Sequence, residues 1–181
     1  MENITKIDTE LSTLITSLKA ELDHYQFESQ FEFVLNKNFD LSFLQNIKYP
    51  GVYLIEIHTG DQGIVFNDWV KSFLEKWQDK EYASHFVPNS RKGRLAAHKD
   101  LSTWFPLYIG KSKDISKRIK EHLYIEMKRP TGALKLIGRE NIYEHVFKVS
   151  TIKVEVKNYD IIMPQLERML RNKINPILGR Q

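Results

Sequence analysis

The sequence predicts an α/β protein of the α+β type, built on a small, mainly antiparallel three-stranded sheet that is flanked by helices. Three segments combine β-branched and aromatic residues with turn signals or alternation, the pattern that favours strands. They lie at about 51–58, 106–110 and 144–157. Around them, apolar residues recur at the three- and four-residue spacing of amphipathic helices. With 181 residues, of which 41% are hydrophobic and 28% charged, the chain has the composition of one well-cored globular domain.

The first part of the chain, residues 1–48, is expected to be a helical extension of the domain at 49–181. From Thr5 to about Tyr25 the apolar residues follow one helical face; they are Ile7, Leu11, Leu14, Ile15, Leu18 and Leu22. The charge of this helix is mostly acidic, so we expect it to pack as a brace or as a dimer element. For residues 27–48, short apolar clusters leave helix and irregular structure as two alternatives.

The first strand is expected to begin at Gly51, and its alternation places Tyr53 and Ile57 on one face. An insertion at about 61–105 separates this strand from the second. Helical spacing of apolar residues near 66–78 predicts a helix within the insertion. The rest of the insertion is basic and has no sustained period, which is typical of a loop.

The second strand is expected to end at Gly110, and a helix follows it. The apolar residues of that helix lie four apart at Ile115, Ile119 and Leu123. Ser112 or Asp114 is expected to cap the helix by accepting a hydrogen bond from its free N–H groups. After the third strand, Pro164 is expected at the start of the last helix.

Composition excludes several classes of chemistry. The chain contains no cysteine, so disulfides, thiolate nucleophiles, iron–sulfur clusters and thiolate zinc sites are ruled out. Its six histidines show no close pairing of the HExxH kind, so a transition-metal site made only of protein ligands is not expected, while carboxylate-held Mg²⁺ stays open. No apolar run approaches the length of a bilayer span, and the N-terminus lacks the layout of a signal peptide. We therefore expect a soluble, cytoplasmic protein without membrane association.

Charge is distributed unevenly along the chain. Residues 1–85 carry a net charge of −7, whereas residues 86–181 carry +11, although the whole chain has only +4. A positive half suits a phosphate-rich partner, because neutralising each phosphate releases counterions. A solvated surface of lysine-rich helices is the alternative explanation.

Two predicted strands carry tyrosine-containing tripeptides, GVY at 51–53 and YIG at 108–110; a helix follows them, and later a helical glutamate. In this order the elements resemble the GIY-YIG nuclease family, from Gly51 to about Arg180. Four further residues stand where that family places functional residues: Lys111, Arg118, His122 and Glu167.

The spacing of two of these residues agrees with what the resemblance implies. Arg118 and His122 are four residues apart, so they project from one helical face and can meet the same phosphodiester. A guanidinium is always charged and its donors match phosphate oxygens. Histidine titrates near neutral pH and can relay a proton.

The resemblance also implies a role for each of the remaining residues. Tyr53 would accept a proton from the attacking water or orient it, and Tyr108 would lie beside it. Lys111 would stabilise phosphate charge together with Arg118. Glu167 would hold Mg²⁺, or Mn²⁺ in its place, at the scissile phosphate.

Each of these residues has an ordinary structural interpretation as well. Tyrosines in strands usually pack in a core, and Lys111 belongs to a strand-to-helix turn. Arg118 and His122 alone would be one solvated face of a helix. Glu167 alone would be a helix-surface residue offset by Arg171, four positions later. Only their joint order and spacing favours the catalytic interpretation.

The insertion departs from the family pattern, because 55 residues separate Tyr53 from Tyr108 where family members have a much shorter hairpin. An insertion beside a small catalytic sheet is a natural place for target recognition. It could equally be a surface loop that closes over the sheet. The candidate DNA-contacting residues are Arg91, Lys92, Arg94, His98 and Lys99, and beyond the insertion Lys113.

The C-terminus departs from the pattern too. Family members commonly carry an asparagine after a proline that follows the glutamate helix, but Gly179 stands at about that place here. Asn175, on the other side of Pro176, is the candidate substitute.

These observations predict a Mg²⁺-dependent DNA endonuclease, sequence-specific and similar to a type II restriction enzyme. Because duplex DNA has two strands to cut, we expect a homodimer on double-stranded DNA. Three alternatives remain: a structure-selective repair or recombination nuclease, a catalytically inactive nucleic-acid-binding module, and an interaction protein. The last would dock through the insertion helix, using Trp69, Phe73 and Trp77.

Overall fold

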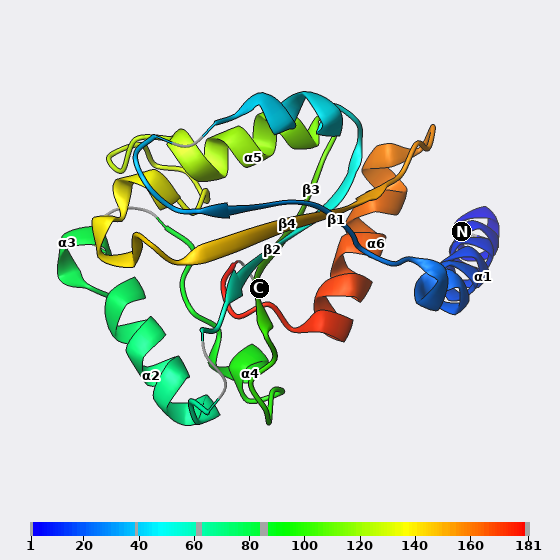
Figure 1. Ribbon diagram of the computed structural model, residues 1–181. Helices are drawn as coiled ribbons and strands as arrows, with labels where there is room; N and C mark the ends of the chain where they lie inside the picture. Colours follow the sequence, from blue (N-terminus) through cyan, green and yellow to red (C-terminus); the bar gives the residue numbers. More distant parts are fainter. Residues whose placement is uncertain (1, 39, 61–62, 84–86, 180–181) are drawn as a thin grey trace.

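The computed structural model describes residues 2–38, 40–60, 63–83 and 87–179. Within these residues the chain folds as an α+β protein around a four-stranded antiparallel sheet (Figure 1). In spatial order the strands are β1 (Glu28–Val34), β4 (Val146–Lys153), β2 (Gly51–His58) and β3 (Trp104–Ser112). The predicted fold class and all three predicted strands are confirmed, but the sheet has one strand more than predicted.

The additional strand is β1, which lies in the segment expected to be helical or irregular. It pairs with β4 from Glu28 opposite Thr151 to Val34 opposite Val146. The segment after it forms a short 3-10 helix, η2 (Ser42–Ile47). Along β1 only Phe33 is buried, because the strand lies at the edge of the sheet. Its apolar alternation is therefore short, and its pairing partner lies more than 100 residues away in the sequence.

The predicted helices form at the expected places. They are α1 (Glu2–Ala20), α2 (Phe66–Trp77), α5 (Ile115–Tyr124) and α6 (Tyr159–Ile174). Asp114 is the N-cap of α5, since its Oδ1 accepts a hydrogen bond from the Lys117 N–H at 3.0 Å. The placement of Pro164 was wrong, because α6 begins at Tyr159 and Pro164 lies inside it. None of the helices in the described residues is long and apolar enough to cross a bilayer.

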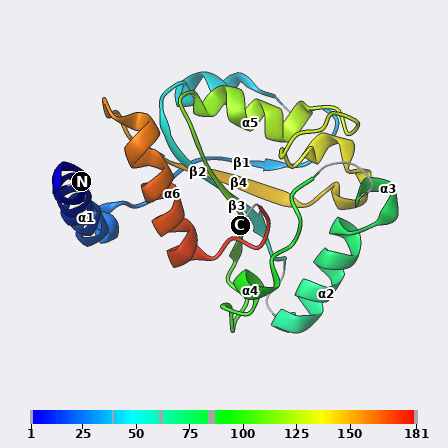
Figure 2. The same cartoon turned by 180° about the vertical axis from the view of Figure 1, so that it is seen from behind.

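Helices cover both faces of the sheet (Figures 1 and 2). On one face, Tyr53 and Ile55 of β2 belong to a core that includes apolar residues of α5, α2 and η2. On the other face, Val52 and Leu54 pack in a core with α6. Neighbouring residues of β2 thus face different helices, as strand alternation requires.

The rest of the chain consists of short helices and the C-terminal segment. The short helices are η1 (Glu21–His24), α3 (Lys80–Ala83), α4 (Lys92–Leu95), η3 (Leu136–Gly138) and η4 (Glu140–Ile142). Leu178 donates its N–H to the Leu107 carbonyl at 2.8 Å and forms a β-bridge with Ser90. The C-terminal segment therefore lies between β3 and the insertion. Asp61 and Gln62 of the insertion and Arg180 lie outside the described residues.

Candidate active site

Tyr53 lies across the neighbouring strand at Gly110. The two residues are register partners of β2 and β3. A Cβ built on Gly110 would stand 2.5 Å from Cζ of the Tyr53 ring and closer still to its hydroxyl, which no real side chain tolerates. The second tripeptide therefore needs its glycine, because the first tyrosine occupies the space that a side chain would fill.

Beyond Gly110, the Tyr53 hydroxyl meets a buried histidine of α5. Tyr53 Oη and His122 Nε2 are 2.9 Å apart, and both residues are buried. The Leu134 N–H donates to His122 Nδ1 at 3.1 Å, so Nδ1 carries the lone pair. In the neutral ring the proton then sits on Nε2, which donates to Tyr53 Oη. The hydrogen of the Tyr53 hydroxyl is left to donate elsewhere.

Burial holds this pair in its neutral form. It lowers the pKa of His122 well below its ordinary value, and the nearby Arg118 charge lowers it further. Burial also raises the pKa of Tyr53 well above its ordinary value, as does Tyr108, whereas Arg118 acts in the opposite direction. With both of its ring nitrogens engaged, His122 has a positioning role in this arrangement. Its predicted proton relay stays a prediction.

Tyr108 reaches the same face of the sheet by strand alternation, two residues before Gly110, and a β-bulge in β3 directly precedes it. Ile55 of β2 is opposite Tyr108 and Glu56 is opposite Pro106, so Leu107 is the extra residue. Leu107 and Tyr108 consequently pack on the same face of the sheet. The Tyr108 ring lies 6.2 Å from the Tyr53 ring and 4.7 Å from the imidazole of His122. The structure thus brings together both tyrosines and the predicted histidine.

A cleft of about 490 Å³ opens beside this cluster. Its lining residues come from the insertion, β3, α5, the loop that follows α5 and the C-terminal segment: Val87, Pro88, Asn89, Arg91, Tyr108, Arg118, Gly132 and Gly179. Tyr108 and Arg118 were predicted as catalytic. Arg91 was predicted only as a DNA contact, and no sequence pattern pointed to Asn89 or Gly132.

Arg118 supplies a permanent positive charge at this cleft. It forms an ion pair with Glu121 of the same helix. Burial lowers its pKa, but Tyr53 and Glu121 outweigh burial, so that the pKa lies above its ordinary value. The guanidinium is therefore charged at any pH at which the protein is folded.

Glu167 and Lys111 lie on the other side of the sheet edge. Glu167 projects from α6, forms an ion pair with Arg171, and is close enough to raise the pKa of Tyr53 and Tyr159. Lys111 Nζ lies 5.9 Å from the centre of the Tyr159 ring. The ion pair between Glu167 and Arg171, which is the ordinary structural interpretation of Glu167, is thus present in the structure.

A metal at Glu167 would need ligands from outside the protein. In the described part of the chain, no group of three or more His, Asp or Glu residues is placed to hold an ion. Mg²⁺ is commonly bound by one or two carboxylates, with waters and substrate phosphates completing its octahedron. One carboxylate fits that pattern, provided that a phosphate supplies the other oxygens.

Two of the five candidate DNA-contacting residues of the insertion, Arg94 and His98, turn toward the C-terminal end of α6. Arg94 donates to the Arg171 carbonyl at 2.6 Å and to Asn172 Oδ1 at 2.7 Å. The Arg171 carbonyl also accepts from the Asn175 N–H at 2.9 Å, so Arg94 is a second donor to it at the helix end. His98 Nε2 lies 2.8 Å from the Asn175 carbonyl. This arrangement agrees with the interpretation of the segment as a closing loop. The lysines at 92 and 99 are exposed.

Arg91 differs from its neighbours. Its Nε donates to the Gly179 carbonyl at 2.7 Å, and the residue lines the cleft. Lys113, the last predicted DNA contact, forms an exposed ion pair with Asp160 at 2.9 Å.

Asn175 and Gly179 have distinct roles at the C-terminus. Asn175 adopts a left-handed conformation that ends α6, and its Oδ1 accepts from Arg94 at 3.1 Å. Gly179 lies against the Tyr108 ring with φ of +132°, a conformation that residues with side chains rarely adopt. An asparagine there would be strained, so glycine at this position is explained by the backbone.

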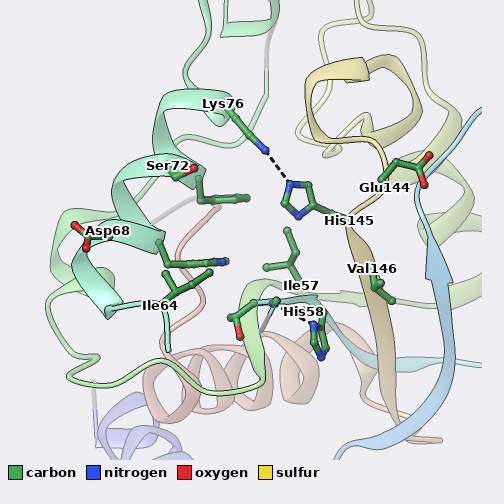
Figure 3. Close-up of a pocket in the computed structure, with 13 residues that line it drawn as sticks. Ile57, His58, Ile64, Asp68, Ser72, Lys76, Glu144, His145 and Val146 are labelled. Carbon is green, nitrogen blue, oxygen red and sulfur yellow. Dashed lines mark hydrogen bonds between the residues drawn. The ribbon is translucent and has the colours of Figure 1, made fainter. Parts of the chain in front are cut away.

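A second cleft, of about 440 Å³, lies between α2 and the start of β4 (Figure 3). Lys76 and His145 point toward one another in it, with Nζ donating to Nε2 at 3.1 Å. Burial lowers the pKa of His145, and Lys76 lowers it further. Residues from Ile57 to Gly60 also line the cleft. It shares no lining residue with the cleft at Tyr108 and contains none of the predicted catalytic residues.

Comparison with known proteins gives no match: no family model, no curated protein and no solved structure matches the chain. Assignment to a nuclease family therefore depends on the order of residues and on their geometry.

Gly110→Ala is expected to displace the Tyr53 ring and to lower the free energy of unfolding by about 1–3 kcal/mol, the usual range for overpacking. Chemical denaturation measures the change. Gly93→Ala is the matched control, because nothing lies within 4 Å of a Cβ at Gly93. Equal stability of the two variants would contradict the close approach of Tyr53 to β3.

His122→Asn is expected to flatten the dependence of stability on pH. The folded protein keeps His122 neutral below pH 6.5, whereas the unfolded chain protonates it, so wild-type stability falls as the pH drops. This contribution is at most about 1.4 kcal/mol per pH unit. Denaturation between pH 5 and 7 should show a smaller slope for His122→Asn than for the wild type. The exposed-site variant His24→Asn should retain the wild-type slope; an unchanged slope in His122→Asn would refute a neutral, buried imidazole.

Proposed function

We propose that the chain is a metal-dependent endodeoxyribonuclease of the GIY-YIG type that hydrolyses phosphodiester bonds of double-stranded DNA at specific sequences. The observation that carries the proposal is the cleft at which Tyr108, Arg118 and Arg91 meet, next to the buried Tyr53–His122 pair. This combination of a fixed cation, a hydroxyl and a buried orienting pair suits a phosphate ester better than it suits a neutral substrate.

In the proposed reaction, the two guanidiniums bind the scissile phosphate. Arg118 is oriented by Glu121 and by the Tyr53 hydroxyl, so it offers its remaining donors in one fixed direction. Arg91 is oriented by the Gly179 carbonyl through Nε, which leaves its terminal amino groups for the phosphate. Charge that develops on the phosphate oxygens in the transition state is stabilised by both.

The attacking water is oriented by hydroxyl groups. Tyr108 lines the cleft and its hydroxyl is the closer candidate, while the buried Tyr53 holds Arg118 and Tyr108 in place. The neutral His122 supports Tyr53 from behind. Tyr53 was predicted to contact the water itself. The cleft instead favours Tyr108 for the contact with the water and Tyr53 for the supporting position.

Mg²⁺ or Mn²⁺, bound by Glu167 and by phosphate oxygens, would neutralise charge and acidify water. Lys111, on the same side of the sheet edge, would add positive charge for the phosphate.

Because a duplex has two strands, the proposed enzyme acts as a homodimer with one cleft for each strand. Recognition of a DNA junction or flap in place of a sequence is the nearest alternative.

A second candidate function is a nucleic-acid-binding module without catalysis. One observation favours it: Glu167 already has a partner in Arg171, and both side chains are mostly buried at 16% and 21% exposure. A metal would have to compete with that guanidinium for the carboxylate.

Cleavage assays with plasmid and phage DNA separate these functions. The wild type is expected to give discrete fragments with Mg²⁺ and none with EDTA. Arg118→Ala should lower the rate by about 100-fold or more, the usual loss for a preorganised donor to a developing charge. Glu167→Ala should abolish the metal-dependent rate, and Lys117→Ala, on the exposed side of α5, should retain it. Metal-dependent nicking or a smear would indicate structure-selective cleavage, and retarded but uncut DNA would indicate the binding module.

Arg91→Gln is expected to lower the cleavage rate about tenfold, as the loss of a charged hydrogen bond worth about 1.5 kcal/mol predicts. The neighbouring Lys92→Gln removes the same charge at an exposed position outside the cleft and should change the rate less than twofold. Single-turnover kinetics at saturating enzyme provide the measurement. Equal effects of the two variants would mean that Arg91 contributes only general charge.

A further inference from the structure

The cleft between α2 and the start of β4 combines an apolar lining with polar groups gathered at one end (Figure 3). Ile57, Trp69 and Phe73 line it and are almost wholly buried, whereas Ile64, which also lines it, is 46% exposed. Its volume of about 440 Å³ is in the range of sites for small organic molecules, which are mainly apolar with a few placed polar groups. We call it the α2 cleft.

Lys76 supplies an uncompensated positive charge at one end of the α2 cleft. Its ammonium group donates to Nε2 of His145 at 3.1 Å, and among the described residues it forms no ion pair with a carboxylate. The two acidic residues that line the cleft, Asp68 and Glu144, point their carboxylates away from the pair (Figure 3). An anion that enters the cleft would therefore meet a cation that the protein leaves without a counter-charge.

His145 adds a second donor beside this charge. Because its Nε2 accepts from Lys76, the neutral ring carries its proton on Nδ1. Burial lowers the pKa of His145 and the Lys76 charge lowers it further, so the ring is neutral at pH 7. Nδ1 has no hydrogen-bond partner in the described part of the chain, and it points toward Ile57, into the cleft (Figure 3). Donors from Lys76 and His145 can thus meet at one acceptor.

The charge of the α2 cleft limits the kind of anion that it can hold. One ammonium group and one neutral imidazole offer a single positive charge. A carboxylate balances that charge, whereas a phosphate monoester carries close to two negative charges at pH 7 and exceeds it. Asp68 and Glu144 are exposed at the cleft and would repel a second negative charge. The site therefore suits a carboxylate better than a phosphate.

We propose that the α2 cleft binds a small organic acid whose carboxylate accepts hydrogen bonds from Lys76 and His145. The apolar body of the acid lies against Ile57, Ile64 and Trp69, where it removes the exposed surface of Ile64 from water. The hydrogen bond from the ammonium group to the carboxylate is charge-assisted and sets the orientation of the ligand. Because the α2 cleft shares no lining residue with the cleft at Tyr108, this binding does not depend on whether the chain cuts DNA.

Titration with phenylacetate, followed by ¹H–¹⁵N correlation NMR, tests the site without any substitution. Phenylacetate is expected to shift the signals of Lys76 and His145 with a Kd of about 1 mM, the range expected for a ligand of this size. Phenylacetamide has nearly the same shape and no charge, so it should bind about tenfold more weakly or less. Equal binding of the acid and the amide, or no shifts up to about 20 mM phenylacetate, would overturn the proposal.

A pair of variants tests the role of the cation. Lys76→Met removes the charge and keeps most of the aliphatic stem, so it is expected to weaken phenylacetate binding about tenfold or more. Lys71→Met removes a charge from an exposed position of the same helix outside the cleft, and should leave the Kd within about twofold. Equal losses in the two variants would refute a specific site. Shifts that gather at Arg91 and Arg118 would refute it too, because they would place the anion in the cleft at Tyr108.

Discussion

The close approach of Tyr53 to Gly110 is the constraint on which the candidate site depends. Only a residue without a side chain lets the Tyr53 ring cross β3 and reach His122 at 2.9 Å. That hydrogen bond joins the centre of the sheet to α5, and the Leu134 N–H closes it from the other side. Because all three polar groups are buried, losing one partner would leave another unsatisfied, at a cost of about 1–3 kcal/mol. Arg118 and Tyr108 gain their positions from the same contact, since both interact with Tyr53.

The wall of the cleft at Tyr108 does not depend on the Tyr53–Gly110 contact. It is formed by pairing between segments that are far apart in the sequence. The C-terminal segment lies against β3 through the hydrogen bond from Leu178 to Leu107, and the insertion lies against that segment through Ser90. Arg94 fastens the insertion to the end of α6. The insertion thus reaches the candidate site by way of the C-terminus, which explains how Arg91 arrives beside Arg118 although they belong to separate elements.

Local periodicity predicted the elements in which the apolar pattern is sustained, whether buried as in β2 or exposed as in α1, and it was wrong at β1, where the pattern is short. The strand at 51–58 is almost wholly buried, so its composition is unmistakable. By contrast, β1 buries only Phe33 and depends on pairing with β4, which no local pattern reveals. The site followed the same division. The tyrosines, Arg118 and His122 lie in periodic elements and their proximity could be predicted, whereas the bulge at Leu107 and the contact of Arg91 with Gly179 depend on tertiary structure.

The positive charge of the C-terminal half is also partly internal, which changes what it implies about a polyanionic partner. Lys135 and Arg139 are fully buried; Lys135 donates to two carbonyls, while Arg139 stacks on Trp77 at 3.8 Å. Burial lowers the pKa of Arg139 to about 10, and neither residue has a carboxylate partner among the described residues. Such cations stabilise loops through hydrogen bonds and contribute little to an external field, as Arg94 does at the end of α6. The net charge of the C-terminal half therefore overstates its attraction for a phosphate backbone. The two guanidiniums at the cleft, Arg91 and Arg118, are the charges placed to attract a phosphate.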